Sequence, residues 1–385
     1  MSTAPDVRPF RISVAQERLD DLRRRLAQVR WPVEPTDVGW SYGVPGEYLR
    51  RLVDHWRTGY DWRAVETRLN ALPQFSTAIL GQPVHFLHVR SPEPAALPLV
   101  LSHGWPGSFV EFLDVLGPLA DPRAHGADPG DAFHLVVPSL PGFAYSGLSG
   151  RVGDGGTEHH AEVVAALLDR LGYPRYGVQG GDAGGFVSAQ LGRIAPDRVV
   201  GVHLNGPFFF PAWDDDPGEQ ATWSPADRER LAVLTDPGWE RFGYAVMQST
   251  RPQTLAYGMH DSPVALLAWI VDLFQQFTDP SRALPEDAVD RDTLLTNVTL
   301  YWLTGTFASS VRLYRESAQW GAQPPNSGVP TGCAVFPGDL TVRALAERQH
   351  TIVHWSEFDR GGHFAALEAP DLFVADVRAF FRPLR

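Results

Sequence analysis

The stretch YGVQGGDAGG, residues 176–185, contains the residue with the clearest chemical potential, Asp182. The residues before it have the composition of a β-strand, and FVSAQLGRIAP after it has the spacing of an α-helix. Glycines on both sides of Asp182 allow the strained turn and close packing that such a junction needs. Turns of this kind expose a nucleophile, normally a serine, whereas a lone aspartate at a helix start is commonly a cap. The nucleophile interpretation therefore depends on the residues that accompany Asp182.

Residues 102–108, SHGWPGS, form the first partner of that turn, because they follow an apolar strand pattern. A loop in this position can aim a backbone N–H at Asp182, and the N–H of Ala183 adds a second donor. Two such donors form an oxyanion hole. The loop and the turn together predict this feature.

A candidate base and a candidate acid follow later strand patterns. His363, in RGGHF, follows the last of them, and Asp339, in FPGD, follows the one before. Asn205 ends an earlier strand pattern and cannot serve as the acid, because its side chain is an amide. Glu357 and Asp359 are too close in sequence to His363 to orient it from another strand. The order nucleophile, acid and base predicts a catalytic triad.

A second motif, GWSYG at residues 39–43, matches the serine-hydrolase pattern G-x-S-x-G. That pattern is informative only between a strand and a helix. The preceding WPVEPTDV contains two prolines and no β-branched run. We therefore predict that Ser41 is not catalytic.

Six short apolar runs after residue 96 alternate with helical patterns and indicate a parallel sheet covered on both faces. They are LPLVLSHG, FHLVVPSLPG, YGVQGGD, VVGVHLNG, TGCAVFPGD and TIVHWSEF. Together with the turn at Asp182, this alternation predicts an α/β-hydrolase fold, an α/β class with a mostly parallel sheet. Helical segments rich in Trp, Phe and Tyr between the fourth and fifth runs indicate an inserted lid. The first ninety or so residues read as helices and a hairpin around Gly81.

These patterns divide the chain into four expected segments. They are an N-terminal domain at 1–90, the first part of the hydrolase core at 91–206, a helical lid at 207–325 and the second part of the core at 326–385.

Composition limits the partners. The net charge of −12 argues against nucleic acid or an anionic membrane. No run of 18 apolar residues is present, and MSTAPDVRPFRIS lacks the apolar core of a signal peptide, so we expect no membrane anchor and a cytoplasmic location. Cys333 is the only cysteine, and all 33 basic residues are arginine, which excludes a lysine Schiff base with pyridoxal phosphate. We expect neither a metal nor a cofactor.

Longer motifs resemble the epoxide hydrolases of the microsomal and juvenile-hormone type over nearly the whole chain. RWPVEP, YGVPGEYL and YDWRAVETRLNALPQF are similar to that family's N-terminal domain. HGWPGS, PSLPGFAYSG, GGDAGG, STRPQT, HDSPVALLAWI, LYWLTGT and RGGHFAALEAP follow in family order. The family usually has Trp after the nucleophile, where this chain has Ala183, a difference that should reshape the pocket more than the chemistry. We expect the chain to lack the membrane anchor of the microsomal members and to resemble the soluble bacterial relatives.

The resemblance adds three residues to the site. It implies that Tyr244 and Tyr314, both from the lid, are acids toward the epoxide oxygen, and that the N–H of Trp105 belongs to the oxyanion hole. It also predicts a cis Trp105–Pro106 bond, which X–Pro sequences allow at a cost of about 0.5–1 kcal/mol.

The implied reaction explains why an aspartate stands where a serine is usual. An epoxide offers a strained sp³ carbon and no carbonyl, and a carboxylate is already ionised at pH 7. Asp182 would open the ring to form an ester, and water activated by His363 would hydrolyse it to a vicinal diol.

Two alternatives stay open at this point. A haloalkane dehalogenase uses the same fold and an aspartate, with Trp105 as its candidate halide donor, and a non-catalytic protein could bind a small apolar ligand in the same pocket. The expected substrates are water and a small apolar, aromatic epoxide, because lid aromatics should surround the site. These are residues 208–210, Trp213, Trp239 and Trp302. The oligomeric state is open, with a homodimer as one option.

Overall fold

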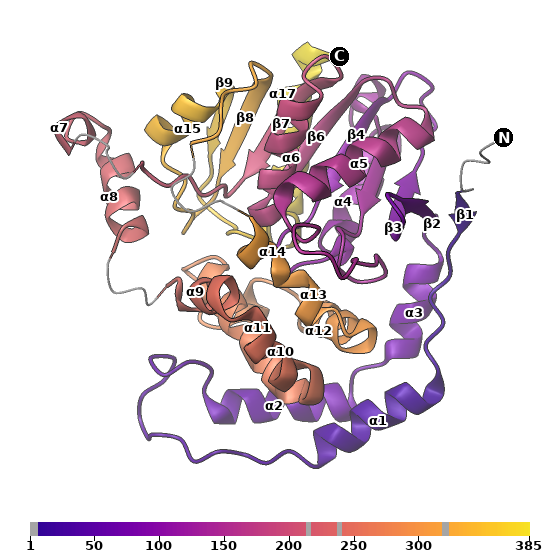
Figure 1. Ribbon diagram of the computed structural model, residues 1–385, viewed down its shortest axis with the longest axis vertical. Helices are drawn as coiled ribbons and strands as arrows, with labels where there is room; N and C mark the ends of the chain where they lie inside the picture. Colours follow the sequence, from indigo (N-terminus) through magenta and orange to yellow (C-terminus); the bar gives the residue numbers. More distant parts are fainter. Residues whose placement is uncertain (1–6, 213–216, 237–240, 318–322) are drawn as a thin grey trace.

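The computed structural model describes residues 7–212, 217–236, 241–317 and 323–385, and its centre is one mixed sheet (Figure 1). The strand order is β1-β2-β3-β5-β4-β6-β7-β8-β9, and the pairs from β5 to β9 are parallel. The parallel strands coincide with the six apolar runs: β4 (Leu97–Ser102), β5 (Phe133–Pro138), β6 (Tyr176–Gly181), β7 (Val199–Asn205), β8 (Pro330–Val335) and β9 (Thr351–Glu357). Strands buried on both faces need no polar alternation, which explains these runs.

The hairpin near Gly81 belongs to the same sheet. Its strands, β2 (Gln74–Ile79) and β3 (Gln82–Val89), are antiparallel, and β3 pairs with β5. The short β1 (Arg8–Pro9) pairs with β2 at the edge. The N-terminal segment therefore shares its sheet with the hydrolase core.

Helices cover both faces of the sheet. On one face α5 (Thr157–Leu171) and α6 (Asp182–Ile194) lie side by side, and on the other α4 (Leu113–Ala120) contacts α17 (Pro370–Phe381) (Figure 1). The short α15 (Arg343–Gln349) and α16 (Ala365–Glu368) flank β9 in sequence. Because β4 lies between β5 and β6, the chain reverses direction across the sheet there, and open α/β sheets bind ligands at such a point.

The lid is the group of helices inserted between β7 and β8, and most of it lies beyond one end of the sheet (Figure 1). Its helices are α7 (Pro217–Gln220), α8 (Pro225–Leu234), α9 (Gly243–Thr250), α10 (Pro252–Asp261), α11 (Pro263–Phe277), α12 (Arg291–Thr304), α13 (Phe307–Ser310) and α14 (Arg312–Glu316).

The N-terminal helices pack against this lid. They are α1 (Gln16–Ala27), α2 (Gly46–Thr58) and α3 (Trp62–Asn70). The indole N–H of Trp56 donates to Thr299 Oγ1 at 2.9 Å. The guanidinium of Arg25 donates to the carbonyl of Asp261 and lies over the ring of Trp302. Trp302 therefore packs against α1, and its expected place around the active site is wrong.

Two further expectations concern the described residues. The GWSYG segment lies in the loop between α1 and α2, where the exposed Ser41 donates to the carbonyl of Val38 at 2.7 Å. It therefore lies outside any strand–turn–helix junction, as its sequence context predicts. No helix in the described ranges is long and apolar enough to cross a membrane.

Candidate active site

Asp182 occupies the turn between β6 and α6 in a conformation that few side chains adopt. Its φ is +50°, and such positive values are strained outside glycine. A Cβ atom on Gly184 would lie 1.9 Å from the carbonyl oxygen of Ser102, so only glycine allows α6 to approach β4 this closely. The strained turn and the glycine-dependent packing predicted from the sequence are both confirmed.

The two carboxylate oxygens of Asp182 have different neighbours. Oδ1 accepts a hydrogen bond from the backbone N–H of Trp105 at 2.8 Å. Oδ2 lies 3.6 Å from Nε2 of His363, and the Asp182 side chain is 14% exposed. The Trp105–Pro106 bond that shapes this loop is cis, as predicted. The loop thus holds one oxygen of Asp182 and leaves the other on the side of the imidazole.

His363 lies between two carboxylates. Its Nδ1 is 3.5 Å from Oδ1 of Asp339, whose Oδ2 accepts from the N–H of Phe336 at 2.8 Å. These imidazole distances exceed an ideal hydrogen bond, as is common in unliganded active sites. A Cβ atom on Gly206 would lie 2.8 Å from Asp339 and 2.9 Å from His363. Gly206, at a φ of +52°, therefore makes room for this pair.

Glu357 and the amide of Asn205, both considered for the acid position, are engaged elsewhere. Glu357 forms an ion pair with Arg230 at 3.1 Å. Asn205 accepts from Gln179 at 2.7 Å and donates to the backbone carbonyl of His363 at 3.2 Å. Of the candidates described, Asp339 is the one whose carboxylate lies against the imidazole.

The charges around His363 favour its protonated form. Burial lowers the pKa of the imidazole, but the carboxylates of Asp182 and Asp339 outweigh this and raise it to about 10. The two carboxylates together produce this effect, since a buried imidazole without them prefers to be neutral.

Tyr244, from α9, and Tyr314, from α14, come together above Asp182. Their ring centroids are 6.0 Å apart, and Trp105 packs against both, stacked on Tyr244 and edge-on to Tyr314. Burial raises the pKa of both phenols well above the ordinary value. Both therefore keep their protons at neutral pH and can donate them.

A narrow cavity of about 40 Å³ connects these groups. It is lined by Asp182, Ala183, Phe186, Phe208, Phe210, Phe242, Tyr244, Leu313 and Tyr314. A neighbouring cavity of about 330 Å³ shares Phe186, Phe208 and Phe210 with it. The expectation of an aromatic site is confirmed for residues 208 and 210, whereas Trp213 and Trp239 lie outside the described residues.

The indole N–H of Trp105 is not available as a ligand donor. It donates to Ser310 Oγ at 3.1 Å, and that hydroxyl donates onward to the carbonyl of Phe307. A dehalogenase that uses Trp105 to hold a halide would need this N–H to face the cavity. The contact argues against that alternative.

Glu111, three residues after the SHGWPGS loop, was not singled out from the sequence. Its side chain is buried, and burial raises its pKa to about 8, with His363 opposing and Asp182 adding to the shift. The only sequence feature that could have pointed to Glu111 is its position as a lone acid inside the apolar stretch FVEF.

A cluster of three or more His, Cys, Asp or Glu side chains placed to hold a metal is absent from the residues that the structure describes.

A mostly parallel sheet with helices on both faces, a strand–turn–helix nucleophile and an inserted lid define an α/β-hydrolase. Residues 7–112 match the family Epoxide hydrolase N terminus, and residues 98–256 match the alpha/beta hydrolase fold. A Stigmatella aurantiaca protein that carries a provisional epoxide hydrolase name is 43% identical, over 98% of this chain and 86% of the relative. Epoxide hydrolase 1 of Sus scrofa is 33% identical, over 97% of this chain and 88% of the relative.

Solved structures give the same result. Aspergillus niger epoxide hydrolase superposes with a TM-score of 0.84 at 33% identity, covering 100% of this chain and 97% of that one. The chain belongs to the epoxide hydrolases, enzymes that add water to a strained ring ether and release a vicinal diol. The family predicted from the sequence motifs is therefore confirmed.

Proposed function

We propose that the chain opens its epoxide through a covalent ester on Asp182 and then hydrolyses that ester. The observation that carries this proposal is the asymmetry of the Asp182 carboxylate. Oδ1 is fixed by the Trp105 N–H at 2.8 Å, whereas Oδ2 accepts no backbone hydrogen bond from the residues that the structure describes and lies 3.6 Å from His363. A carboxylate held by one oxygen can attack with the other.

In the first step Oδ2 attacks a ring carbon and the carbon–oxygen bond on its far side breaks. Tyr244 and Tyr314 hold the departing oxygen by hydrogen bonds and supply its proton. The position of both phenols on the cavity lined by Asp182 supports this role, and burial keeps both protonated until the ring opens.

In the second step water attacks the ester carbonyl, whose oxygen is the former Oδ1. The N–H groups of Trp105 and Ala183 stabilise the resulting oxyanion. His363, positioned by Asp339, takes one proton from water. The tetrahedral intermediate then collapses, the bond between the acyl carbon and the ester oxygen breaks, and the released alkoxide takes the second proton of that water. The products are a vicinal diol and the free carboxylate.

Ester formation itself would prepare His363 as a base. The pKa of the imidazole is raised by two carboxylates, and the ester removes the charge of one of them. The pKa then falls and His363 passes its proton to the tyrosine that protonated the epoxide oxygen. The neutral imidazole can therefore accept a proton from water only after Asp182 has reacted.

Substitution of His363 by glutamine separates the two steps. The variant should form the ester on Asp182 at nearly the wild-type rate and then stall, because only the second step uses the base. Intact mass spectrometry after one equivalent of an aryl epoxide should show the protein plus substrate. A variant that forms no adduct would contradict the proposal, and Asp182→Ala provides the adduct-free control.

We also propose an apolar, aromatic epoxide as the substrate. The phenylalanine-lined cavity at Asp182 supports this, and the adjoining cavity of about 330 Å³ offers room for the epoxide substituent.

Four further expectations from the sequence remain predictions. They are the lid boundaries at 207–325, the boundaries of the other three segments, the cytoplasmic location and the homodimer.

A further inference from the structure

Tyr314 lies in a helix that is too short to be stable by itself. The helix α14 spans only Arg312–Glu316, and one helical turn gains little from its own hydrogen bonds. A phenol that must meet a ring oxygen needs firmer support. The first and last residues of the helix, Arg312 and Glu316, provide it.

Arg312 and Glu316 are bonded to each other along the helix. Nε of Arg312 lies 2.7 Å from Oε1 of Glu316. The Arg312 side chain is 22% exposed and that of Glu316 is 8% exposed. A pair this sheltered is screened less by solvent than an ordinary surface pair.

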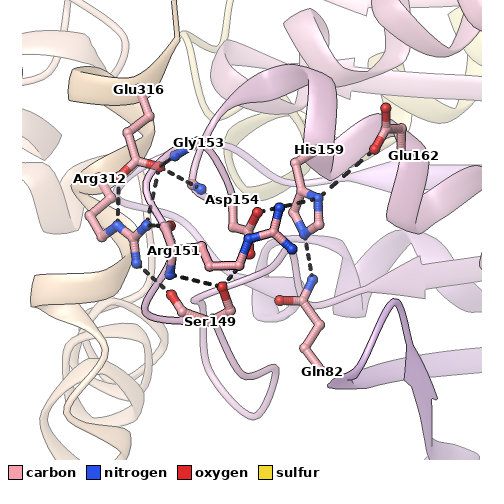
Figure 2. Close-up of polar contacts among 10 residues, drawn as sticks. Gln82, Ser149, Arg151, Gly153, Asp154, His159, Glu162, Arg312 and Glu316 are labelled. Carbon is pink, nitrogen blue, oxygen red and sulfur yellow. Dashed lines mark hydrogen bonds and ion pairs between the residues drawn. The ribbon is translucent and has the colours of Figure 1, made fainter.

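The same two side chains hold the loop at residues 149–155, which lies between β5 and α5 of the hydrolase core (Figure 2). Arg312 donates to the carbonyl of Ser149 at 2.7 Å and also to the carbonyl of Arg151. Oε2 of Glu316 accepts from the N–H groups of Gly153 and Gly155, both at 2.8 Å. A lid helix is thereby joined to the core.

The loop is itself braced, so it can serve as a fixed support. Ser149 donates to Asp154, and the N–H of Arg151 donates to Ser149 Oγ at 3.0 Å (Figure 2). A Cβ atom on Gly155 would lie 2.8 Å from Cβ of Arg312, so the loop packs directly on α14.

We propose that Arg312, Glu316 and the 149–155 loop form a clamp that positions the Tyr314 hydroxyl for epoxide opening. This rests on the proposed function, in which Tyr314 donates to the departing oxygen. Arg312 and Glu316 are positioning residues that act through Tyr314. Misplacement of a reacting group by about 1 Å can cost about 10²-fold in rate.

A double-mutant cycle tests the clamp, with ester formation and ester hydrolysis timed separately by rapid quench and intact mass spectrometry. Arg312→Met should slow ester formation about 10–100-fold and leave ester hydrolysis within about 2-fold of wild type. In a Tyr314→Phe background the same substitution should have almost no further effect, because the group it positions is gone. Arg312→Lys should recover part of the rate.

The control is Arg51→Met, which removes an arginine–glutamate pair of the same spacing, 2.9 Å apart on the exposed surface of α2. It should leave both steps unchanged. If Arg312→Met does not fold, Glu316→Gln replaces it in the cycle, since it keeps an acceptor of the same shape but removes the charge.

Three results would overturn the clamp. The first is that Arg312→Met slows ester formation as much in the Tyr314→Phe background as in wild type. The second is that Arg312→Met slows ester hydrolysis instead of ester formation. The third is that Arg312→Met forms the ester at the wild-type rate. Failure of the proposed function looks different, since wild-type enzyme would then form no ester at all. In that case the clamp has no role in epoxide opening.

Discussion

Asp182 and His363 face each other across the site, with Oδ2 of the carboxylate 3.6 Å from Nε2 of the imidazole. The pKa of His363 is raised to about 10, against the effect of burial, by Asp182 and Asp339. This pair makes the protonation state of the base depend on the chemical state of the nucleophile.

Removing the charge of Asp182 should therefore lower the pKa of His363. In Asp182→Asn one of the two carboxylates is lost while burial persists, so the imidazole should titrate below its wild-type pKa. NMR titration of the histidine ring, assigned by comparison with His363→Gln, measures this. An unchanged pKa would show that the two groups are not coupled.

The same shift predicts how stability depends on pH. A pKa raised from about 6.5 to about 10 in the folded protein gives stability that is fully present below pH 6.5 and is lost as pH rises toward 10. The stability advantage of wild type over Asp182→Asn should therefore shrink across that range. Thermal unfolding of both proteins at matched ionic strength provides the measurement, and an advantage that grows with pH would be the wrong sign.

Asp339 should matter for the second step alone. Asp339→Asn should leave ester formation nearly intact and slow ester hydrolysis about 10²–10⁴-fold, because the imidazole loses the carboxylate that orients it. Pre-steady-state accumulation of the adduct reports this. Glu357→Gln is the matched control, since Glu357 is paired with Arg230 at 3.1 Å, and it should turn over normally. Normal turnover by Asp339→Asn would show that Asp339 has no role in ester hydrolysis.

The two tyrosines should matter for the first step alone. Tyr244→Phe combined with Tyr314→Phe should slow ester formation about 10²–10⁴-fold, because the ring oxygen departs without a donor. Each single variant should lose less, since one phenol remains. Rapid-quench measurement of adduct formation separates these cases. Wild-type ester formation by the double variant would mean that another acid protonates the epoxide oxygen.

The turn at Asp182 should not tolerate a larger residue beside it. In Gly184→Ala the new Cβ would lie 1.9 Å from the carbonyl oxygen of Ser102, so the free energy of unfolding should fall by about 1–3 kcal/mol or more. Gly150→Ala, which has nothing within 4 Å of its Cβ, should change it little. Urea unfolding of both variants compares them, and equal stabilities would show that the close packing at Gly184 is not required.

The sequence could predict the residues at the strand ends because the parallel strands are continuous apolar runs. Asp182, Asp339 and His363 each follow such a run, and the carboxyl ends of parallel strands meet at one edge of a sheet. The topology therefore brought together residues that are far apart in the chain. The two tyrosines depended on motif resemblance, because a lid tyrosine has no distinguishing local pattern.

Contacts between distant segments could not be predicted in the same way. The hairpin was visible as two strands, but its pairing with β5 is not encoded in either strand alone. The contacts of Arg312 and Glu316 with the 149–155 loop join segments about 160 residues apart, and a charged pair on a short helix normally indicates a solvated surface. Trp302 was wrongly expected at the active site because its aromatic character does not show which part of the protein it packs against.

The most direct test of the covalent mechanism follows one oxygen atom. A single turnover in ¹⁸O-labelled water, with enzyme in excess, should give mostly unlabelled diol, because the added oxygen comes from the carboxylate of Asp182 and water replaces it only when the ester is hydrolysed. The label should then appear in the peptide that contains Asp182. Fully labelled diol in that first turnover, with no label in the protein, would show that water attacks the epoxide directly and would contradict Asp182 as the nucleophile.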